Sequence, residues 1–268
     1  MGLSGERVRN VIAALQALYR RNRRKVHVDP TLDLDLPAPG GSRVWTRPIS
    51  DVAALIKAAP ADDRAIWASA FYAGPRLGEL RALRTRDVDL ASKVEIDERQ
   101  GNIVRKVERN AHSINIVHGW HARAGQIAPK SQAGVRPIPV AEILRVELAA
   151  HIERTRRSGD ELLFGRSPTL PFTQTRVQHD ADEVWRTAGL ERVTFHDGRH
   201  FLKSLMDHAG ISESRSDRYL GHSDGRVANN YRHLLPGQLA EDAKTLDEFL
   251  AGTKSRKVVP FDAERRSA

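Results

Sequence analysis

Hydrophobic residues recur at helical spacing through most of this chain. Near its start, Val11, Leu15 and Leu18 fall on one face of a single stretch, which predicts an amphipathic helix there. Turn and capping residues bound several further stretches of this kind. The stretches predicted to be helical are residues 8–19, 50–59, 62–73, 77–84 and 142–156, and most of the chain from there to residue 250.

Between residues 88 and 140 the pattern changes to short runs rich in β-branched residues. These runs read VEID, IVRKV, SINIV and RPIPV, and polar turn residues separate them. Such runs favour strands, so we expect a small antiparallel sheet of three or more strands, with a hairpin at residues 130–134. The predicted fold class is therefore mainly α with a small antiparallel β-sheet (α+β).

The chain is expected to divide into three parts. Residues 1–40 hold one predicted helix and the sequence TLDLDLPAPGG, whose Pro and Gly residues are typical of a linker. One helix cannot bury its own apolar face, so it is either the remnant of a larger module or a helix docked on the main domain. The main domain is expected over residues 44–250. Residues 251–268 show no periodicity, which predicts a flexible tail.

The charge balance favours an anionic partner. The chain has 268 residues, enough for a substantial core, and 40% of them are hydrophobic. Lys and Arg number 43 against 34 Asp and Glu, a net charge of +9. Nucleic acid is the first candidate for such a surface, although a basic surface can also serve solubility alone.

Two absences from the sequence narrow the chemistry and the location. The chain has no cysteine, which excludes disulfides, thiolate catalysis and cysteine-bound metal sites. No apolar run approaches the roughly 20 residues that cross a bilayer, and the first residues lack the apolar stretch of a signal peptide. We therefore expect a cytoplasmic protein that makes no contact with a membrane.

Three short motifs near the C-terminal end carry the candidate chemistry. They read HDGRH at 196–200, LGHSD at 220–224 and NNYRH at 229–233. Tyr231 can attack phosphorus, but its phenol has an ordinary pKa near about 10 and needs neighbouring positive charge to lose its proton. Arg199 follows His196 by three residues, so on a helix the two side chains point the same way. A guanidinium suits a phosphate because its planar fork donates paired hydrogen bonds.

Other candidates lie upstream of and between these motifs. Arg76 stands in AGPRLGELRAL, and Glu79 one turn later is placed to orient it. Lys130 stands at the predicted hairpin tip, from which an ammonium can reach a leaving oxygen. His196 and His222 can donate hydrogen bonds or pass protons, since imidazole titrates near neutrality. Each residue alone is more often a surface charge or a packing residue, so their order along the chain is what selects them.

Taken together, these residues resemble the tyrosine recombinases of the phage integrase family over residues 44–249. Arg76 with Glu79 matches the first arginine motif, and Lys130 matches the lysine of the family's β-hairpin. The remaining matches are His196 and Arg199 with the H-x-x-R motif, His222 with the L-G-H motif and Tyr231 with the nucleophile.

The resemblance has limits that bear on function. Residues 8–39 resemble the last helix of the family's core-binding domain and its linker, whereas full members clamp DNA between two domains. Gly198 stands where the family commonly has leucine, which is expected to loosen the start of that helix by up to about 1 kcal/mol. Pro75 stands where an apolar residue is more usual.

The resemblance implies a site-specific recombinase or integrase that cleaves and rejoins double-stranded DNA through a 3′-phosphotyrosyl intermediate. It implies no metal, no other cofactor and no small-molecule substrate, and family members act as homotetramers on paired sites. The implied roles are nucleophile for Tyr231, phosphate binding for Arg76, Arg199 and His222, acceptance of the phenol proton for His196, and protonation of the leaving 5′-oxygen for Lys130.

Several alternatives remain open. A type IB topoisomerase shares the tyrosine chemistry, and a truncated integrase remnant would bind DNA without cutting it. A basic structural domain unrelated to DNA is a third possibility. Residues 239–250 predict an amphipathic helix that docks either on its own domain or on a neighbouring protomer.

Overall fold

The computed structural model describes residues 5–26, 28–38, 48–100, 103–129, 134–221 and 237–253. Contacts divide the chain into two units, Met1–Val44 and Trp45–Ala268. Three of the predicted catalytic residues, Lys130, His222 and Tyr231, lie outside the described residues.

The first unit contains the predicted N-terminal helix, α1 (Gly5–Asn22). Residues 28–38 return along this helix, and the Gln16 side-chain amide donates to the Thr31 carbonyl at 3.2 Å. Val11 and Leu18 on the predicted apolar face are still 52% and 57% exposed. The returning segment thus covers only part of the apolar face of α1.

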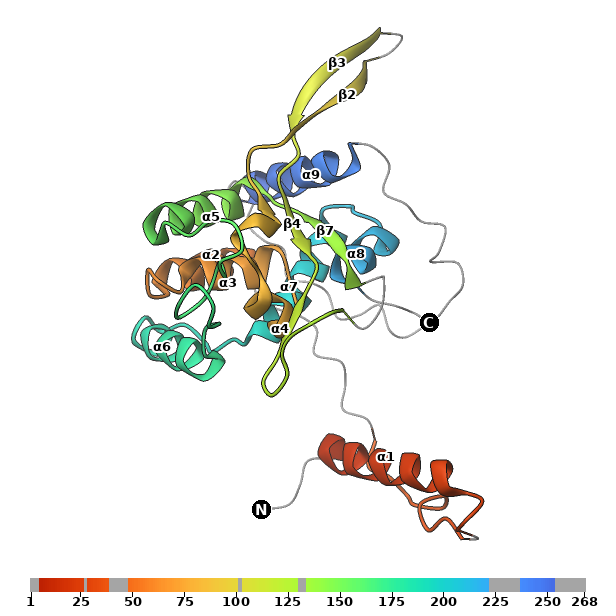
Figure 1. Ribbon diagram of the computed structural model, residues 1–268. Helices are drawn as coiled ribbons and strands as arrows, with labels where there is room; N and C mark the ends of the chain where they lie inside the picture. The colour runs from red at the N-terminus through yellow and green to blue at the C-terminus, as the bar shows by residue number, and fades with distance from the viewer. Residues whose placement is uncertain are drawn as a thin grey trace. The chain divides into compact units, whose positions relative to one another are not determined.

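The second unit is built around a buried helix. Every residue from Ala65 to Tyr72 in α3 is buried, as expected for a helix that is apolar on all sides. Other helices pack around it, among them α7, α5 and α2. Its helices are α2 (Ile49–Ala58), α3 (Arg64–Tyr72), α4 (Leu77–Ala82), α5 (Glu142–Thr155), α6 (Gln174–Thr187), α7 (Phe195–His208), α8 (Glu213–Leu220) and α9 (Gln238–Thr253), with a 3-10 turn η1 (Thr85–Asp87) (Figure 1).

An aromatic cluster joins four of these helices. The Trp67 ring of α3 stacks on Phe195 of α7, with centroids 4.2 Å apart and planes inclined by 3°. Trp185 of α6 meets Trp67 edge-on at 4.7 Å, and its indole nitrogen donates to the Leu55 carbonyl of α2 at 2.9 Å. Such pairs add to the burial of the rings themselves. This packing fixes the first two turns of α7, which carry His196 and Arg199, against α3.

The strands form three separate antiparallel groups. The central sheet has the order β1 (Val88–Asp89), β4 (Ser113–Ile116), β7 (Arg136–Pro139). β2 (Lys93–Gln100) pairs only with β3 (Ile103–Asn110), and this ribbon extends away from the helices in Figure 1. β5 (Gly119–His121) pairs with β6 (Gly125–Ile127). The predicted class, mainly helical with a small antiparallel sheet, is confirmed.

Two details of the predicted sheet are wrong. The runs VEID and IVRKV pair with each other outside the central sheet, which leaves SINIV and RPIPV to pair within it. The strands before and after Lys130 do not pair with each other, because β6 pairs with β5 and β7 pairs with β4. The β5–β6 hairpin escaped prediction because its strands, GWH and GQI, contain a single β-branched residue.

The helix ends also differ slightly from the prediction. α2 begins at Ile49 after Pro48, without a side-chain cap from Ser50 or Asp51. α4 ends at Ala82, and α9 continues to Thr253, three residues into the predicted tail. Residues 254–268 lie outside the described residues. No described helix is both long and apolar enough to cross a membrane.

α9 packs on its own unit. Ala240, Ala243 and Leu246 are buried, and the helix contacts β7 and α5. Asp247 of α9 accepts a hydrogen bond at 2.7 Å from the backbone nitrogen of Glu142, at the start of α5. In this single chain, α9 thus lies on its own domain, which is one of the two docking alternatives that the sequence left open.

Candidate active site

Four helix ends meet where the described candidates lie. The C-terminal end of α3, the start of α4, the first turns of α7 and the C-terminal end of α8 are joined by arginine side chains. Of the predicted catalytic residues, the structure describes Arg76, His196 and Arg199. The local sequence explains the position of each.

Arg76 immediately precedes α4 and is held by Glu79. Gly74 has φ +60, which lets the chain turn sharply between α3 and α4. The Glu79 carboxylate accepts from the Arg76 backbone nitrogen at 2.8 Å and from Nη1 at 3.0 Å, as a capping residue does. Nη2 donates to the Gly221 carbonyl at 2.7 Å. The Arg76 side chain is 48% exposed, so part of its guanidinium faces solvent.

Arg199 reaches the same place from α7. It is only 7% exposed, and its Nη1 donates to the Gly74 carbonyl at 3.0 Å while Nη2 donates to the Leu220 carbonyl. Burial, together with the nearby charges of Arg76 and Arg136, lowers the pKa of Arg199 to about 10. Arg199 therefore remains a cation at neutral pH and brings positive charge to the junction.

His196 lies in the first turn of α7, where it is exposed. Thr194 and Asp197 form a capping box that starts this helix, so the position of His196 is fixed by local sequence. Its ring meets the ring of His200 edge-on, with centroids 4.5 Å apart. His196 is thus accessible from solvent, whereas Arg199, one turn later, is buried.

Gly198 has a packing role that the sequence did not reveal. A Cβ atom at this position would lie 2.6 Å from the carbonyl oxygen of Ala70 in α3, closer than real Cβ contacts. The glycine therefore allows α7 to approach the backbone of α3. A leucine, common here in the family, would force the two helices apart. Glycine at this position weakens the helix locally, but it is also the residue that lets the two helix backbones come this close.

Arg136 is a buried cation that no sequence motif indicated. It lies on β7 and is 4% exposed. Its Nη2 and Nη1 donate to the two carboxylate oxygens of Glu79 at 2.7 and 3.1 Å, and its Nε donates to the Tyr219 carbonyl at 2.6 Å. The available signal was a charged residue in the strand RPIPV, whose pattern predicts burial.

Three arginines together cap the C-terminal end of α8. Gly221 ends this helix with φ +66. The last carbonyls of a helix lack partners within it and carry partial negative charge, so cations are stabilising there. Each of the last three carbonyls accepts from a different arginine. The pairs are Tyr219 with Arg136, Leu220 with Arg199 and Gly221 with Arg76.

This junction, defined by Arg76, Arg136, Arg199 and Glu79 and here called the arginine junction, carries surplus positive charge. Burial alone would raise the pKa of Glu79, but hydrogen bonds and charge from Arg136, and bonds from Arg76, hold it below its ordinary value. Glu79 is therefore ionised and balances one of the three cations. An oxyanion suits such a place.

Lys130, His222 and Tyr231 lie outside the described residues, so their predicted roles stay predictions. Gly221, the last described residue of that segment, directly precedes His222 in the sequence. Among the described residues, no group of three or more His, Asp or Glu side chains could hold a metal ion.

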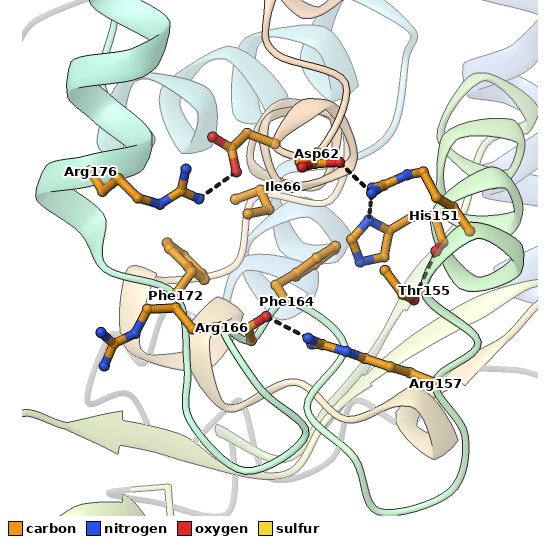
Figure 2. Close-up of a pocket in the computed structure, with 12 residues that line it drawn as sticks. Asp62, Ile66, His151, Thr155, Arg157, Phe164, Arg166, Phe172 and Arg176 are labelled. Carbon is orange, nitrogen blue, oxygen red and sulfur yellow. Dashed lines mark hydrogen bonds and ion pairs between the residues drawn. The ribbon is translucent and has the colours of Figure 1, made fainter.

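A pocket lies at the opposite, N-terminal end of α3 (Figure 2). Three of its four arginines are bound by other groups of the protein. Arg176 pairs with Asp63 at 2.8 Å, Arg154 pairs with Asp62, and Arg157 donates to carbonyls of the loop after α5. None of the predicted catalytic residues lines this pocket, and its ion pairs indicate a structural brace.

The comparisons with sequence relatives agree on one family. The chain is 26% identical over 204 residues to the "Putative prophage phiRv2 integrase" of Mycobacterium tuberculosis, covering 75% of this chain and 50% of that protein. It is 26% identical over 203 residues to a "Tyrosine recombinase XerC-like" protein of Caldanaerobacter subterraneus, covering 69% of this chain and 49% of that protein. The chain thus spans about half the length of these relatives.

Solved structures show the same fold. A complex of the Tn1549 transposon integrase with a circular intermediate DNA matches with a TM-score of 0.63 at 17% identity, covering 91% of this chain and 80% of that chain. The integrase from mycobacterium phage Brujita matches with a TM-score of 0.53 at 16% identity, covering 93% and 78%. A model of the phage integrase family matches residues 49–237, most of the second unit. The chain therefore belongs to the phage integrase family, and its second unit is a tyrosine recombinase catalytic domain.

Proposed function

We propose that this chain is a site-specific recombinase that cleaves and rejoins double-stranded DNA through a phosphotyrosyl bond to Tyr231. The observation that carries the proposal is the meeting of Arg76 and Arg199 at the C-terminal end of α8. The two arginines are 123 residues apart in the sequence, and the fold brings their guanidinium groups to one place. Family membership supplies the reaction class.

Arg76 is suited to contact a DNA phosphate. Its side chain is half exposed, and Glu79 holds it at the start of α4. The hydrogen bonds of Arg76 to Glu79 and Gly221 use only part of its fork, and no other described residue takes up the rest. Non-bridging phosphate oxygens can therefore bind to Arg76 without displacing Glu79.

Arg199 contributes charge from a buried position. The charge of a guanidinium in a low-dielectric site acts more strongly on a nearby phosphate than an exposed charge does. Its bonds to Gly74 and Leu220 hold it in one orientation before DNA binds. Two arginines here neutralise the negative charge on the non-bridging phosphate oxygens, a task that metal ions perform in many other phosphoryl transfer enzymes.

In the proposed cleavage step, the Tyr231 oxygen attacks phosphorus as its proton passes to His196. The bond from phosphorus to the 5′-oxygen breaks, and Lys130 gives that oxygen a proton. His222 adds a hydrogen bond to the phosphate. The product is a 3′-phosphotyrosyl ester and a free 5′-hydroxyl, so attack by the 5′-hydroxyl of another strand reverses the step and rejoins DNA without an external energy source.

The proposed partner is double-stranded DNA in the cytoplasm, bound by a homotetramer on paired sites. The net charge of +9 supports an anionic partner, and the Tn1549 integrase structure contains DNA. Phosphate contacts should dominate, which gives binding a steep dependence on salt. Because α9 is docked on its own unit here, assembly requires either a different contact or release of this helix.

A covalent capture experiment tests the proposal. The protein is incubated with a pool of randomised duplexes, each carrying a 5′-bridging phosphorothiolate whose sulfur, once released, does not rejoin. We expect a protein–DNA band that resists denaturant, and sequencing of the trapped DNA should reveal the preferred site. Tyr231→Phe should bind this DNA equally well and form no adduct.

Other outcomes would point to the alternatives. DNA binding without any adduct would overturn the proposed chemistry and favour a remnant that only occupies sites. Trapped DNA without sequence preference, together with relaxation of supercoiled plasmid, would favour a type IB topoisomerase. Equal adduct formation by Tyr231→Phe would remove Tyr231 as the nucleophile.

A further inference from the structure

We propose that Arg136 is a positioning residue for the DNA cleavage reaction. It would act by holding Glu79, and the backbone at the end of α8, in the arrangement that presents the catalytic groups to the phosphate. This inference rests on the function proposed above and adds a residue that does not itself contact DNA.

The burial of Arg136 rules out a direct contact with DNA in this arrangement. Its side chain is 2% exposed. A buried guanidinium is costly unless it is fully paired. Besides Glu79 and Tyr219, it donates to the Gly134 carbonyl at 3.0 Å, so Nε, Nη1 and Nη2 all have acceptors. Any effect on chemistry must pass through these neighbours.

The first neighbour of Arg136, Glu79, connects it to Arg76. Glu79 accepts from Arg136 through both carboxylate oxygens, and the same oxygens hold the backbone and the guanidinium of Arg76. A two-point pairing fixes the plane of the carboxylate. Without Arg136, Glu79 would keep only its bonds to Arg76, and the carboxylate could rotate with it. Arg136 therefore determines where the Arg76 fork points.

The second neighbour of Arg136 is the backbone at the end of α8, which directly precedes His222 in the sequence. Arg136 donates to the Tyr219 carbonyl, and its guanidinium lies directly against Gly221: a Cβ atom at position 221 would be 2.8 Å from Arg136 Cζ. Glycine at the helix end thus allows the guanidinium to support the turn itself. Removing the guanidinium would leave a void beneath the last described residue before His222.

The third neighbour lies four residues after Lys130 in the sequence. The Gly134 carbonyl accepts from Arg136 Nη1 at the start of β7. One buried side chain therefore ties together chain segments next to three predicted catalytic residues. These are Arg76 through Glu79, His222 through Tyr219 and Gly221, and Lys130 through Gly134.

Arg157 offers a matched control for a purely structural role. It also donates to backbone carbonyls, those of Leu162, Leu163 and Gly165, and it is partly buried. It lies in the pocket at the far end of α3 (Figure 2). Loss of either guanidinium should reduce the stability of the fold, but only loss of Arg136 should disturb the reaction.

The experiment compares Arg136→Met with Arg157→Met in the full chain. The DNA captured by the wild-type protein is used at saturating protein concentration, and three quantities are measured: the single-turnover rate of adduct formation, the Kd for the same DNA and the Tm. We expect Arg136→Met to slow adduct formation roughly 10- to 100-fold, as loss of a charged hydrogen-bond partner would, with Kd changed less than about threefold. Arg157→Met should leave the rate near that of wild type.

Rescue by small cations gives a readout that stability alone would not change. Low millimolar guanidinium chloride should restore part of the rate to Arg136→Ala, whose cavity can take the ion, and should not accelerate Arg157→Ala. Arg136→Lys should stay slow because a single ammonium cannot pair with two oxygens of Glu79 and a carbonyl together. If Arg136→Met does not fold, Arg136→Lys takes its place in the rate comparison.

The possible results distinguish the positioning role of Arg136 from the proposed function of the chain. Adduct formation by Arg136→Met and Arg136→Lys at the wild-type rate would overturn the positioning role and leave the proposed function standing. An equal fall in rate for the variants at 136 and 157, without rescue, would reduce Arg136 to a structural role. Absence of any adduct with the wild-type chain would overturn the proposed function, and the inference with it.

Discussion

The two ends of α3 both gather arginines, but the two groups differ in how these arginines are paired with carboxylates. At the N-terminal end, Arg154 and Arg176 each face an aspartate of their own. At the C-terminal end, Arg76 and Arg136 share Glu79, while Arg199 donates to the neutral carbonyls of Gly74 and Leu220. The two ends therefore differ in how their carboxylates are paired: Asp62 and Asp63 have one arginine partner each, whereas Glu79 has two.

The buried carboxylates at the two ends show the same contrast. Asp63 has a raised pKa because burial outweighs its bond to Arg176, and its Oδ2 has no hydrogen-bond partner among the described residues. Glu79 has a lowered pKa because Arg136 and Arg76 together outweigh burial. A single arginine does not offset the burial of a carboxylate here, whereas two do. A carboxylate held by two arginines is thus a feature of the candidate site and not of the pocket.

The largest expected effect is on the reaction rate. Arg199→Lys keeps the charge but loses the fork, so we expect adduct formation to fall roughly 10²- to 10³-fold. Arg176→Lys at the other end of α3 should leave the rate unchanged. Single-turnover adduct formation with both variants measures this difference. Comparable rates for the two would show that the arginine junction has no special part in catalysis.

The two carboxylates should respond to substitution with opposite signs. Glu79→Gln should lower the stability at pH 7 by about 3 kcal/mol, since it breaks buried ion pairs. The folded pKa of Glu79 is lowered, so its contribution is present above its unfolded pKa and is lost as pH falls through the folded value. The Tm deficit of Glu79→Gln should therefore be full at pH 7 and shrink only as the pH falls below 4.5, the ordinary pKa of a glutamate.

Asp63→Asn provides the other half of this test. The folded pKa of Asp63 is raised, so its ionisation costs stability as pH rises through the folded value. At pH 7 the substitution should leave the Tm unchanged or raise it. A Tm loss at pH 7 as large as that of Glu79→Gln would contradict the difference drawn between the two ends.

A packing substitution tests how closely α7 must approach α3. Gly198→Ala should destabilise the fold by about 2 kcal/mol, because its new methyl group meets the Ala70 carbonyl. Gly252→Ala in α9 meets nothing within 4 Å and should stabilise by up to about 1 kcal/mol through helix propensity. Thermal unfolding of both variants measures the sign of each change. If Gly252→Ala destabilised the fold as much as Gly198→Ala, the close approach of Gly198 to Ala70 would not be the cause of the loss.

The smallest effect is expected at the pocket. Arg154→Lys keeps a cation beside Asp62, and both side chains are substantially exposed. Exposed ion pairs contribute about 0–1 kcal/mol, so Tm should change by no more than a few degrees and adduct formation should not change. A pronounced loss of adduct formation would show that the pocket takes part in the reaction.

Local patterns in the sequence were sufficient for most helices and for the strand-forming runs. They did not determine which strand pairs with which, because pairing depends on contacts between distant segments; the GWH and GQI hairpin separates β4 from β7 in sequence without separating them in the sheet. The motif order selected Arg76, Glu79 and Arg199, which the structure brings to one helix end.

Two residues at that end had no sequence motif to reveal them. Arg136 reads as one basic residue among 43, and its importance lies in burial and in partners 57 and 83 residues away. Gly198 reads as a weak helix former, and only the proximity of Ala70 explains it. Both depend on how α3, α7, α8 and β7 pack, which no local pattern encodes.

The absence of a side chain at Gly198 also limits how far α7 can shift relative to α3 next to the candidate site. Where two helices meet through leucines, rotamer changes can absorb shifts of some tenths of an ångström. Here the stop is a main-chain carbonyl within a fully buried helix, which has no rotamers. The residue that follows is Arg199, so its backbone is held at this close contact, and its guanidinium is fixed at the end of α8 by the bond to the Leu220 carbonyl.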